Sequence, residues 1–295
     1  MNDTEAMTAR SARRKRSRTV HLRDDILGSL PNAGLALSVT ATLFWWFYGM
    51  AVRGTSNTVE VMPFMDDPDA YHAYWLSQAF GWAALLWAWV ALFLGLLISG
   101  RTPRWIMRHR KGIEDQHRRI SLTVIALTLA HAVALLFDAH DTTLAEILVP
   151  GAYGHAPGRF AVGLGIVALY LVIPLTLSFY IRNHIGHRTW RLVHRFVIVV
   201  YSMGVWHTFL WGTNVWFTGW PRTALWAVQI PLALLFLYRL MTPSRSSDKL
   251  PQGVPNLRTR SGWRHLRRLA VRLAVAAIIV ALVLAAFNDG GRPRI

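Results

Sequence analysis

Long apolar stretches, separated by shorter polar or basic segments, dominate the pattern of this chain. A membrane-spanning helix needs about 20 mostly apolar residues, and several stretches are long enough. Because lipid offers no hydrogen-bond partner to the backbone, spans of this kind must be helical. The pattern predicts an all-α integral membrane protein with a six-helix bundle and a seventh transmembrane helix. The predicted spans are about 33–52, 73–99, 119–137, 160–181, 195–211, 222–241 and 269–287.

The polar segments predict how the chain is divided. The run "RSARRKRSRTV" near the N-terminus is longer than the basic region of a signal peptide, and no small-residue cleavage site follows it, so we expect it to be retained. A stretch rich in Ser, Pro and Gly precedes the last span and is typical of a linker. The expected parts are a basic cytoplasmic segment (1–32), a six-helix transmembrane domain (33–241), a cytoplasmic linker (242–268), the seventh helix (269–287) and an outer tail (288–295).

The distribution of charge predicts the orientation. The formal net charge is +17, which on a soluble protein would suggest nucleic acid as a partner. Here the Lys and Arg residues gather in the N-terminal segment and in the loops before predicted spans three, five and seven. By the positive-inside rule, we expect a multi-pass protein of the cell membrane with a cytoplasmic N-terminus and an outer C-terminus. Its basic loops would face lipid headgroups, and no nucleic-acid partner is expected.

The chain contains no cysteine. This excludes disulfides, thiolate metal sites, iron–sulfur clusters and covalently attached c-type haem.

Two predicted spans carry histidines at matching depths. His117 and His131 lie at the start and deep inside span three, and His194 and His207 lie likewise in span five. Ionisable side chains at membrane depth are costly and usually functional, although a neutral imidazole can also simply hydrogen-bond across helices. Both spans run in the same direction, and each pair is separated by roughly 20 Å along its helix. Two levels with one histidine from each helix suit two stacked haems, each with two axial imidazoles.

The spacing also raises a geometric problem. It is fourteen residues in span three (117 to 131) and thirteen in span five (194 to 207). In an ideal helix, fourteen residues return to about −40° and thirteen to about 220°. Span five must therefore be distorted or tilted, or one of its histidines is not a ligand.

Arginines accompany the histidines at the inner level. Arg118 follows His117, and Arg195 follows His194. Such side chains can pair with haem propionates through charge-assisted hydrogen bonds. They also fit the positive-inside pattern, and both interpretations can hold together.

The segments "QHRRISLTVIALTLAHAVALLFD" and "RTWRLVHRFVIVVYSMGVWHTFLWG" resemble the ferric reductase-like transmembrane domain over roughly 75–240. Its relatives include ferric reductases, NADPH oxidases and the haem subunit of the bacterial methionine sulfoxide reductase system. The resemblance implies one or two haems b, with His117 paired to His194 and His131 to His207. Where only one haem is held, the resemblance favours the pair that lies deeper in the membrane.

Unlike many of these relatives, the sequence shows no Gly-rich dinucleotide fingerprint and no soluble segment large enough for a flavin domain. We therefore expect an oxidoreductase component that takes electrons from a separate cytoplasmic flavoprotein or reduced flavin and delivers them to an acceptor outside. One alternative is a single-haem membrane subunit of a two-component reductase. The other is a haem-free transporter or scaffold in which the histidines bond across helices.

Overall fold

The structure is a computed structural model that describes residues 21–99, 104–139, 142–241 and 273. The described residues are helical and contain no strand. The predicted linker, the outer tail and nearly all of the predicted seventh helix lie outside these residues, as does most of the N-terminal segment.

The described residues include six helical segments long and apolar enough to cross a membrane, so this is a multi-pass membrane protein. The first, α2, begins at Leu22, within the segment assigned to the N-terminal tail, and contains Pro31. Spans five and six are each built from two helices. The spans are α2 (Leu22–Val52), α4 (His72–Ile98), α5 (Arg104–Ala134), α7 (Arg159–Leu177), α9 with α10 (His187–His194 and Val197–Trp211) and α11 with α12 (Trp220–Ala227 and Gln229–Met241).

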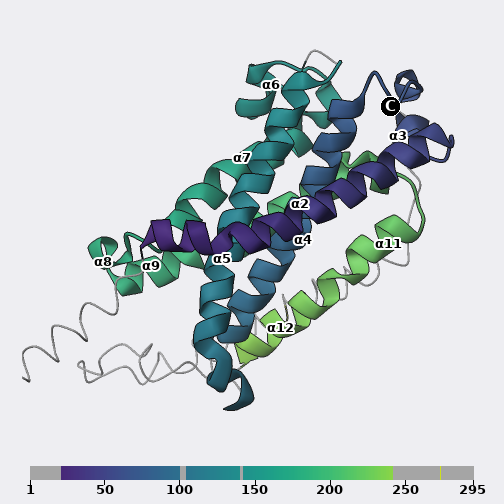
Figure 1. Ribbon diagram of the computed structural model, residues 1–295. Helices are drawn as coiled ribbons and strands as arrows, with labels where there is room; N and C mark the ends of the chain where they lie inside the picture. Colours follow the sequence, from purple (N-terminus) through teal and green to yellow (C-terminus); the bar gives the residue numbers. More distant parts are fainter. Residues whose placement is uncertain (1–20, 100–103, 140–141, 242–272, 274–295) are drawn as a thin grey trace, which may run out of the picture.

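Short elements lie at the two ends of the bundle (Figure 1). The basic end carries α8 (Arg182–Ile185), α9 and the beginning of α5, with many arginines. The acidic end carries Asp138, Glu146 and the other short helices. These are α3 (Asn57–Val61), η1 (Pro63–Met65), η2 (Leu135–Phe137), α6 (Leu144–Leu148), η3 (Ala156–Gly158) and η4 (Thr213–Val215).

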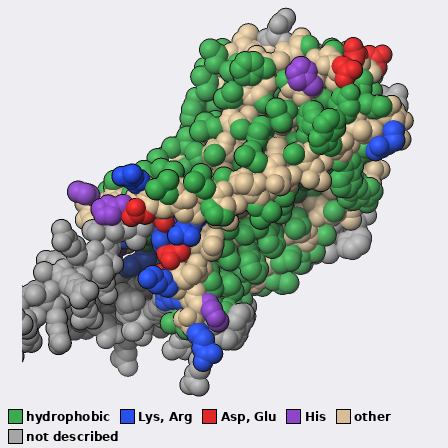
Figure 2. All heavy atoms as spheres, in the orientation of Figure 1, with side chains coloured by type: hydrophobic (Ala, Val, Ile, Leu, Met, Phe, Trp, Pro, Cys, Tyr) green, Lys and Arg blue, Asp and Glu red, His purple; other side chains and the backbone are tan. Residues whose placement is uncertain are grey.

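Small side chains let the central helices approach one another closely. Ala36 of α2 and Ala83 of α4 are fully buried in a cluster that also contains Val124 of α5. Small residues at helix crossings are typical of membrane proteins, where packing replaces the hydrophobic effect. Helix α2 crosses α4 and α5 obliquely (Figure 1). Apolar side chains cover most of the face seen in Figure 2, as a lipid-facing surface requires.

A buried carboxylate joins three segments at the basic end. Asp25 of α2, 3% exposed, accepts hydrogen bonds from Arg118 Nε (2.8 Å) and from the hydroxyl of Tyr180 (2.9 Å). Burial, together with the bond to Asp25, raises the pKa of Tyr180 above its ordinary value, so its hydroxyl remains a donor. The ion pair with Arg118 fixes α2 against α5, and the hydrogen bond from Tyr180 fixes α2 against the turn that follows α7.

Candidate functional site

A cavity of about 1020 Å³ extends along the bundle between α4, α5, α7 and α10. Typical ligand pockets measure about 300–1,000 Å³, so this cavity has room for a large ligand or for two. Its lining includes Arg239 near the basic end and Asp138 near the acidic end. All four histidines of the two predicted pairs line it: His117, His131, His194 and His207.

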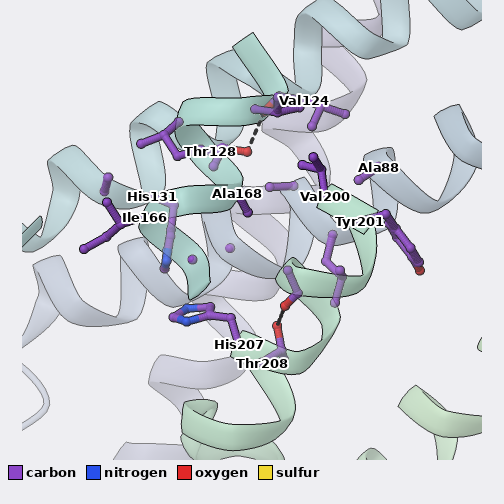
Figure 3. A pocket seen from close by; sticks show the side chains of 18 of the residues that line it. Ala88, Val124, Thr128, His131, Ile166, Ala168, Val200, Tyr201, His207 and Thr208 are labelled. Carbon is purple, nitrogen blue, oxygen red and sulfur yellow. Dashed lines mark hydrogen bonds between the residues drawn. The ribbon is translucent and has the colours of Figure 1, made fainter. Parts of the chain in front are cut away.

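The structure brings these histidines together in two pairs. The ring centroids of His117 and His194 are 6.1 Å apart with an interplanar angle of 87°. Those of His131 and His207 are 6.4 Å apart at 70° (Figure 3). The sequence suggested this pairing, and the role of these side chains as ligands stays a prediction.

The separation within each pair fits two imidazoles on opposite sides of one metal ion. A metal–imidazole bond is about 2.0–2.1 Å, and a ring nitrogen lies roughly 1.2 Å from the ring centre, so such ring centres stand roughly 6.4 Å apart. The observed 6.1 and 6.4 Å agree with this value. No cluster of three or more His, Asp or Glu side chains within the described ranges could hold a metal. Any metal here would have two protein ligands and would need the others from elsewhere.

Backbone carbonyls fix the orientation of three of the four rings. Because a carbonyl can only accept, each Nδ1 carries the proton and Nε2 keeps its lone pair, the state that suits a metal ligand. These Nε2 atoms make no hydrogen bond within the described part of the chain, so they remain available. The bonds, all 2.8 Å, run from His117 Nδ1 to Ala91 O, from His131 Nδ1 to Ser77 O and from His207 Nδ1 to Ala161 O.

A glycine lies four residues after each of these carbonyls. Positions i and i+4 share a helix face, so each ring lies over the glycine one turn away from its acceptor. A Cβ atom would stand 3.0 Å from a ring atom at Gly81, 3.1 Å at Gly95 and 3.0 Å at Gly165. The sequence analysis missed this repeated spacing of an accepting carbonyl and a glycine.

His194 is held differently. Its Nδ1 is buried without a hydrogen bond to any described residue. The carbonyl of Leu175 lies near this ring and accepts a hydrogen bond from Ser178 Oγ (2.7 Å). Instead, the ring of Trp190 stacks on His194, with centroids 5.1 Å apart and an interplanar angle of 23°.

A break in span five allows both of its histidines to face the cavity. Helix α9 ends at His194, and α10 begins at Val197. Between them, the amides of Arg195 and Phe196 bond to the carbonyls three residues back, at 3.3 and 3.0 Å, in a tighter 3₁₀ pattern. The distortion expected from the thirteen-residue spacing is therefore present.

The arginines separate into two groups. Arg195 and Arg239 line the cavity near the basic end, and Arg239 Nε donates to Ser99 Oγ (3.1 Å). Arg118, expected beside a cofactor, lies outside the lining and pairs with Asp25 and with Asp115 (2.7 Å). A buried carboxylate needs a cationic partner, and Arg118 serves as the partner of Asp25. Sequence reasoning missed Arg239, whose only signal was a cation at the end of span six.

Apolar side chains line the middle section of the cavity, between the two histidine levels. Val124, Ala168 and the buried Val200 line this middle section (Figure 3). Tyr201 also lines it, and its hydroxyl donates to Gln229 Oε1 (2.8 Å), where α12 begins. The section therefore offers a dry, mostly apolar environment between the two levels.

Comparison with known families agrees with this architecture. Residues 68–205 match a family described as "Ferric reductase like transmembrane component". This segment is similar to a ferric reductase-like transmembrane domain. It contains His117, His131 and His194, and it ends just before His207. The ferric reductase-like domain indicates a membrane electron-transfer function. No curated protein and no solved structure matched the chain.

Proposed function

We propose that this protein holds haem b between its paired histidines and carries electrons across the membrane. The observation that carries the proposal is the geometry of the two pairs, 6.1 and 6.4 Å between ring centroids inside one cavity. Two opposed imidazoles leave four equatorial positions of a metal unfilled, and the described part of the chain offers no further ligand cluster. A flat macrocycle that brings four nitrogens meets this need.

Haem bound here would supply one-electron exchange at its iron. The histidines hold the group, and the carbonyls of Ser77, Ala91 and Ala161 orient three of the rings. The small residues beside the rings leave space for them, and the apolar middle section excludes water. This arrangement suits relay of electrons and leaves no open metal position for a substrate.

Arg195 and Arg239 are the cations we propose for the propionates at the basic end. Both line the cavity there, and forked guanidinium–carboxylate hydrogen bonds are strong and geometrically specific. Arg118 contributes indirectly, because its pair with Asp25 fixes α5, which carries His117.

The direction of transfer follows from the charge of the two ends. We propose that the basic end faces the cytoplasm, as the positive-inside rule indicates, and accepts electrons from a separate flavoprotein or reduced flavin. An acidic partner would complement the exposed arginines of α9. The acceptor would then bind outside, at the acidic end. An inside-negative membrane potential would assist outward transfer by about 2.3 kcal/mol per electron per 100 mV.

A single-haem subunit of a two-component reductase is the second candidate. It is favoured by the difference between the pairs, because both His131 and His207 have their Nδ1 atoms bonded, whereas His194 does not. The single haem would then lie between His131 and His207.

A reduced-minus-oxidised difference spectrum, with haem measured per chain, tests these proposals. We expect two haems in the wild type and loss of one on replacing any of the four histidines with alanine. His155 lines the acidic end of the cavity outside either pair, so His155→Ala should keep the full content. A wild type that holds one haem, and keeps it in His117→Ala and in His194→Ala, indicates the single-haem subunit. Absence of a Soret band after haem-replete expression contradicts haem binding and supports a transporter or scaffold.

A further inference from the structure

The two histidine pairs differ in how their imidazoles are supported. At the acidic level both Nδ1 atoms donate to carbonyls at 2.8 Å. At the basic level only His117 does so, and the Nδ1 of His194 is buried without a hydrogen bond in the described structure. An Nδ1–H that donates to a carbonyl makes the imidazole a more basic ligand. The two imidazoles at the basic level are therefore, taken together, the less basic ligands and would donate less electron density to a bound metal.

The His194 ring is in contact with the Trp190 ring, whereas its Nδ1 atom has no hydrogen bond among the described residues. Trp190 and His194 are four residues apart on α9 and share a face, and their rings stack at 23°. Phe179 packs against the indole edge-on, with centroids 5.9 Å apart. The guanidinium of Arg182 lies 3.7 Å from the centroid of that phenylalanine ring. The indole Nε1 is itself buried without a described partner, so stacking is the contact that the structure shows between Trp190 and His194.

The charged side chains that line the two ends of the cavity differ in the same sense. Arg195 and Arg239 line the cavity at the basic level, whereas Asp138 and Glu146 line it at the acidic end. Reduction of a metal centre adds one negative charge, so nearby cations favour the reduced state and nearby carboxylates oppose it. Ligand basicity and local charge thus both raise the reduction potential at the basic level relative to the acidic level.

We propose that Trp190 is a positioning residue that orients His194 by stacking, and that the His117–His194 pair forms the site of higher reduction potential. The proposal rests on the proposed haem function. Trp190 also keeps water away from the His194 Nδ1 atom. Without the indole, water bonds to that nitrogen, the imidazole becomes more basic, and the potential of this site falls.

Redox titration of the haem-loaded full chain tests the proposal. His117→Ala and His131→Ala assign the two steps, and the basic-level step should be the one at higher potential. In Trp190→Leu we expect the reduction potential of this step to fall by about 59 mV, which is a tenfold decrease in the equilibrium constant for a one-electron reduction. The potential of the other step should be unchanged. Trp190→Phe keeps a stacking ring and should restore most of the shift.

Trp206→Leu is the matched control. Trp206 precedes His207 but packs on Phe209 and Trp226 and not on a histidine, so neither step should move. Selective loss of the basic-level haem in Trp190→Leu, with rescue by phenylalanine, also supports positioning. An unchanged basic-level step, an equal shift of both steps, or a lower potential at the basic level overturns the inference. A wild type whose only haem depends on His131 and His207 also overturns it and leaves single-haem transfer intact, whereas absence of haem removes the proposed function itself.

Discussion

Gly165 lies directly against the ring of His207, where a Cβ atom would stand 3.0 Å from the Nδ1 atom. The same ring donates from Nδ1 to the carbonyl of Ala161, one turn earlier on α7. One face of α7 therefore supplies both the acceptor that orients this imidazole and the space that the ring needs.

Gly165→Ala should weaken haem binding at the acidic level. The methyl group would displace the His207 ring by a few tenths of an ångström and stretch its bond to Ala161. Loss of comparable support around metal ligands costs about 10- to 100-fold in affinity. Haem content per chain and the difference spectrum measure the effect. Gly163→Ala is the control, because its Cβ would meet only ordinary contacts at 3.8 and 3.9 Å and should leave the spectrum unchanged.

Asp25→Ala should destabilise the bundle, because it leaves the Arg118 guanidinium without its most buried partner. Breaking a buried ion pair costs about 3–5 kcal/mol, and thermal unfolding in detergent measures the loss. The exposed neighbour serves as the control, since Asp24→Ala should stay within about 0.5 kcal/mol of the wild type. Equal stability of the two variants would show that the Asp25–Arg118 pair does not hold α2 in place.

Tyr180→Phe should lower the free energy of unfolding by less than Asp25→Ala does, and this loss should depend on pH. Its hydroxyl donates to Asp25, and such a bond contributes about 0.5–1.5 kcal/mol. The pKa of Tyr180 is raised in the folded state by burial and by Asp25. The contribution is therefore complete below an unfolded-state pKa of about 10 and declines as the pH rises above it. Unfolding of both proteins at pH 8 and above pH 10 checks this, and a difference that grows at high pH would contradict it.

The ring angles predict the electron paramagnetic resonance spectrum of the oxidised protein. Axial imidazoles at 87° and 70° are closer to perpendicular than to parallel, which brings two iron d orbitals close in energy. We expect low-spin signals with a large maximum g value, larger for the 87° pair. His131→Ala and His194→Ala should each remove one signal. Rhombic signals typical of parallel imidazoles would show that the rings rotate when haem binds.

Arg239→Gln should weaken haem retention at the basic level alone. A hydrogen bond from a charged donor contributes about 1.5–3 kcal/mol, which is on the order of 10- to 100-fold in affinity. Haem loss on dilution, followed in the presence of an apoprotein acceptor, measures the effect. Arg188 is exposed on α9 and lies outside the cavity lining, so Arg188→Gln should retain haem as the wild type does. Equal loss from both variants would indicate a general effect of charge.

The apolar pattern was enough to predict the helical membrane fold, because a long apolar stretch in lipid has few alternatives to a helix. It predicted the start of α2 poorly. The basic run near the N-terminus favours a solvated segment up to residue 32, whereas α2 begins at Leu22 and Asp25 is buried against Arg118. An ion pair between residues distant in sequence leaves no local signal.

The pairing of the histidines could be anticipated because depth along parallel helices follows from residue counting. The support around them could not. The repeated spacing of carbonyl and glycine uses backbone acceptors, which any residue provides, and each glycine taken alone indicates only helix packing. Arg118 and Arg239 both looked like positive-inside residues, and only the fold separates the one paired with Asp25 from the one that lines the cavity.

The interruption at Arg195–Phe196 makes α9 a short lever that carries Trp190 and His194 together. Contact of another protein with the exposed face of α9 would act on His194 through eight residues of helix. Because α10 is a separate helix, His207 would be insulated from that contact. If electrons pass through both histidine pairs as proposed, a partner bound to α9 would change the His117–His194 level more than the His131–His207 level.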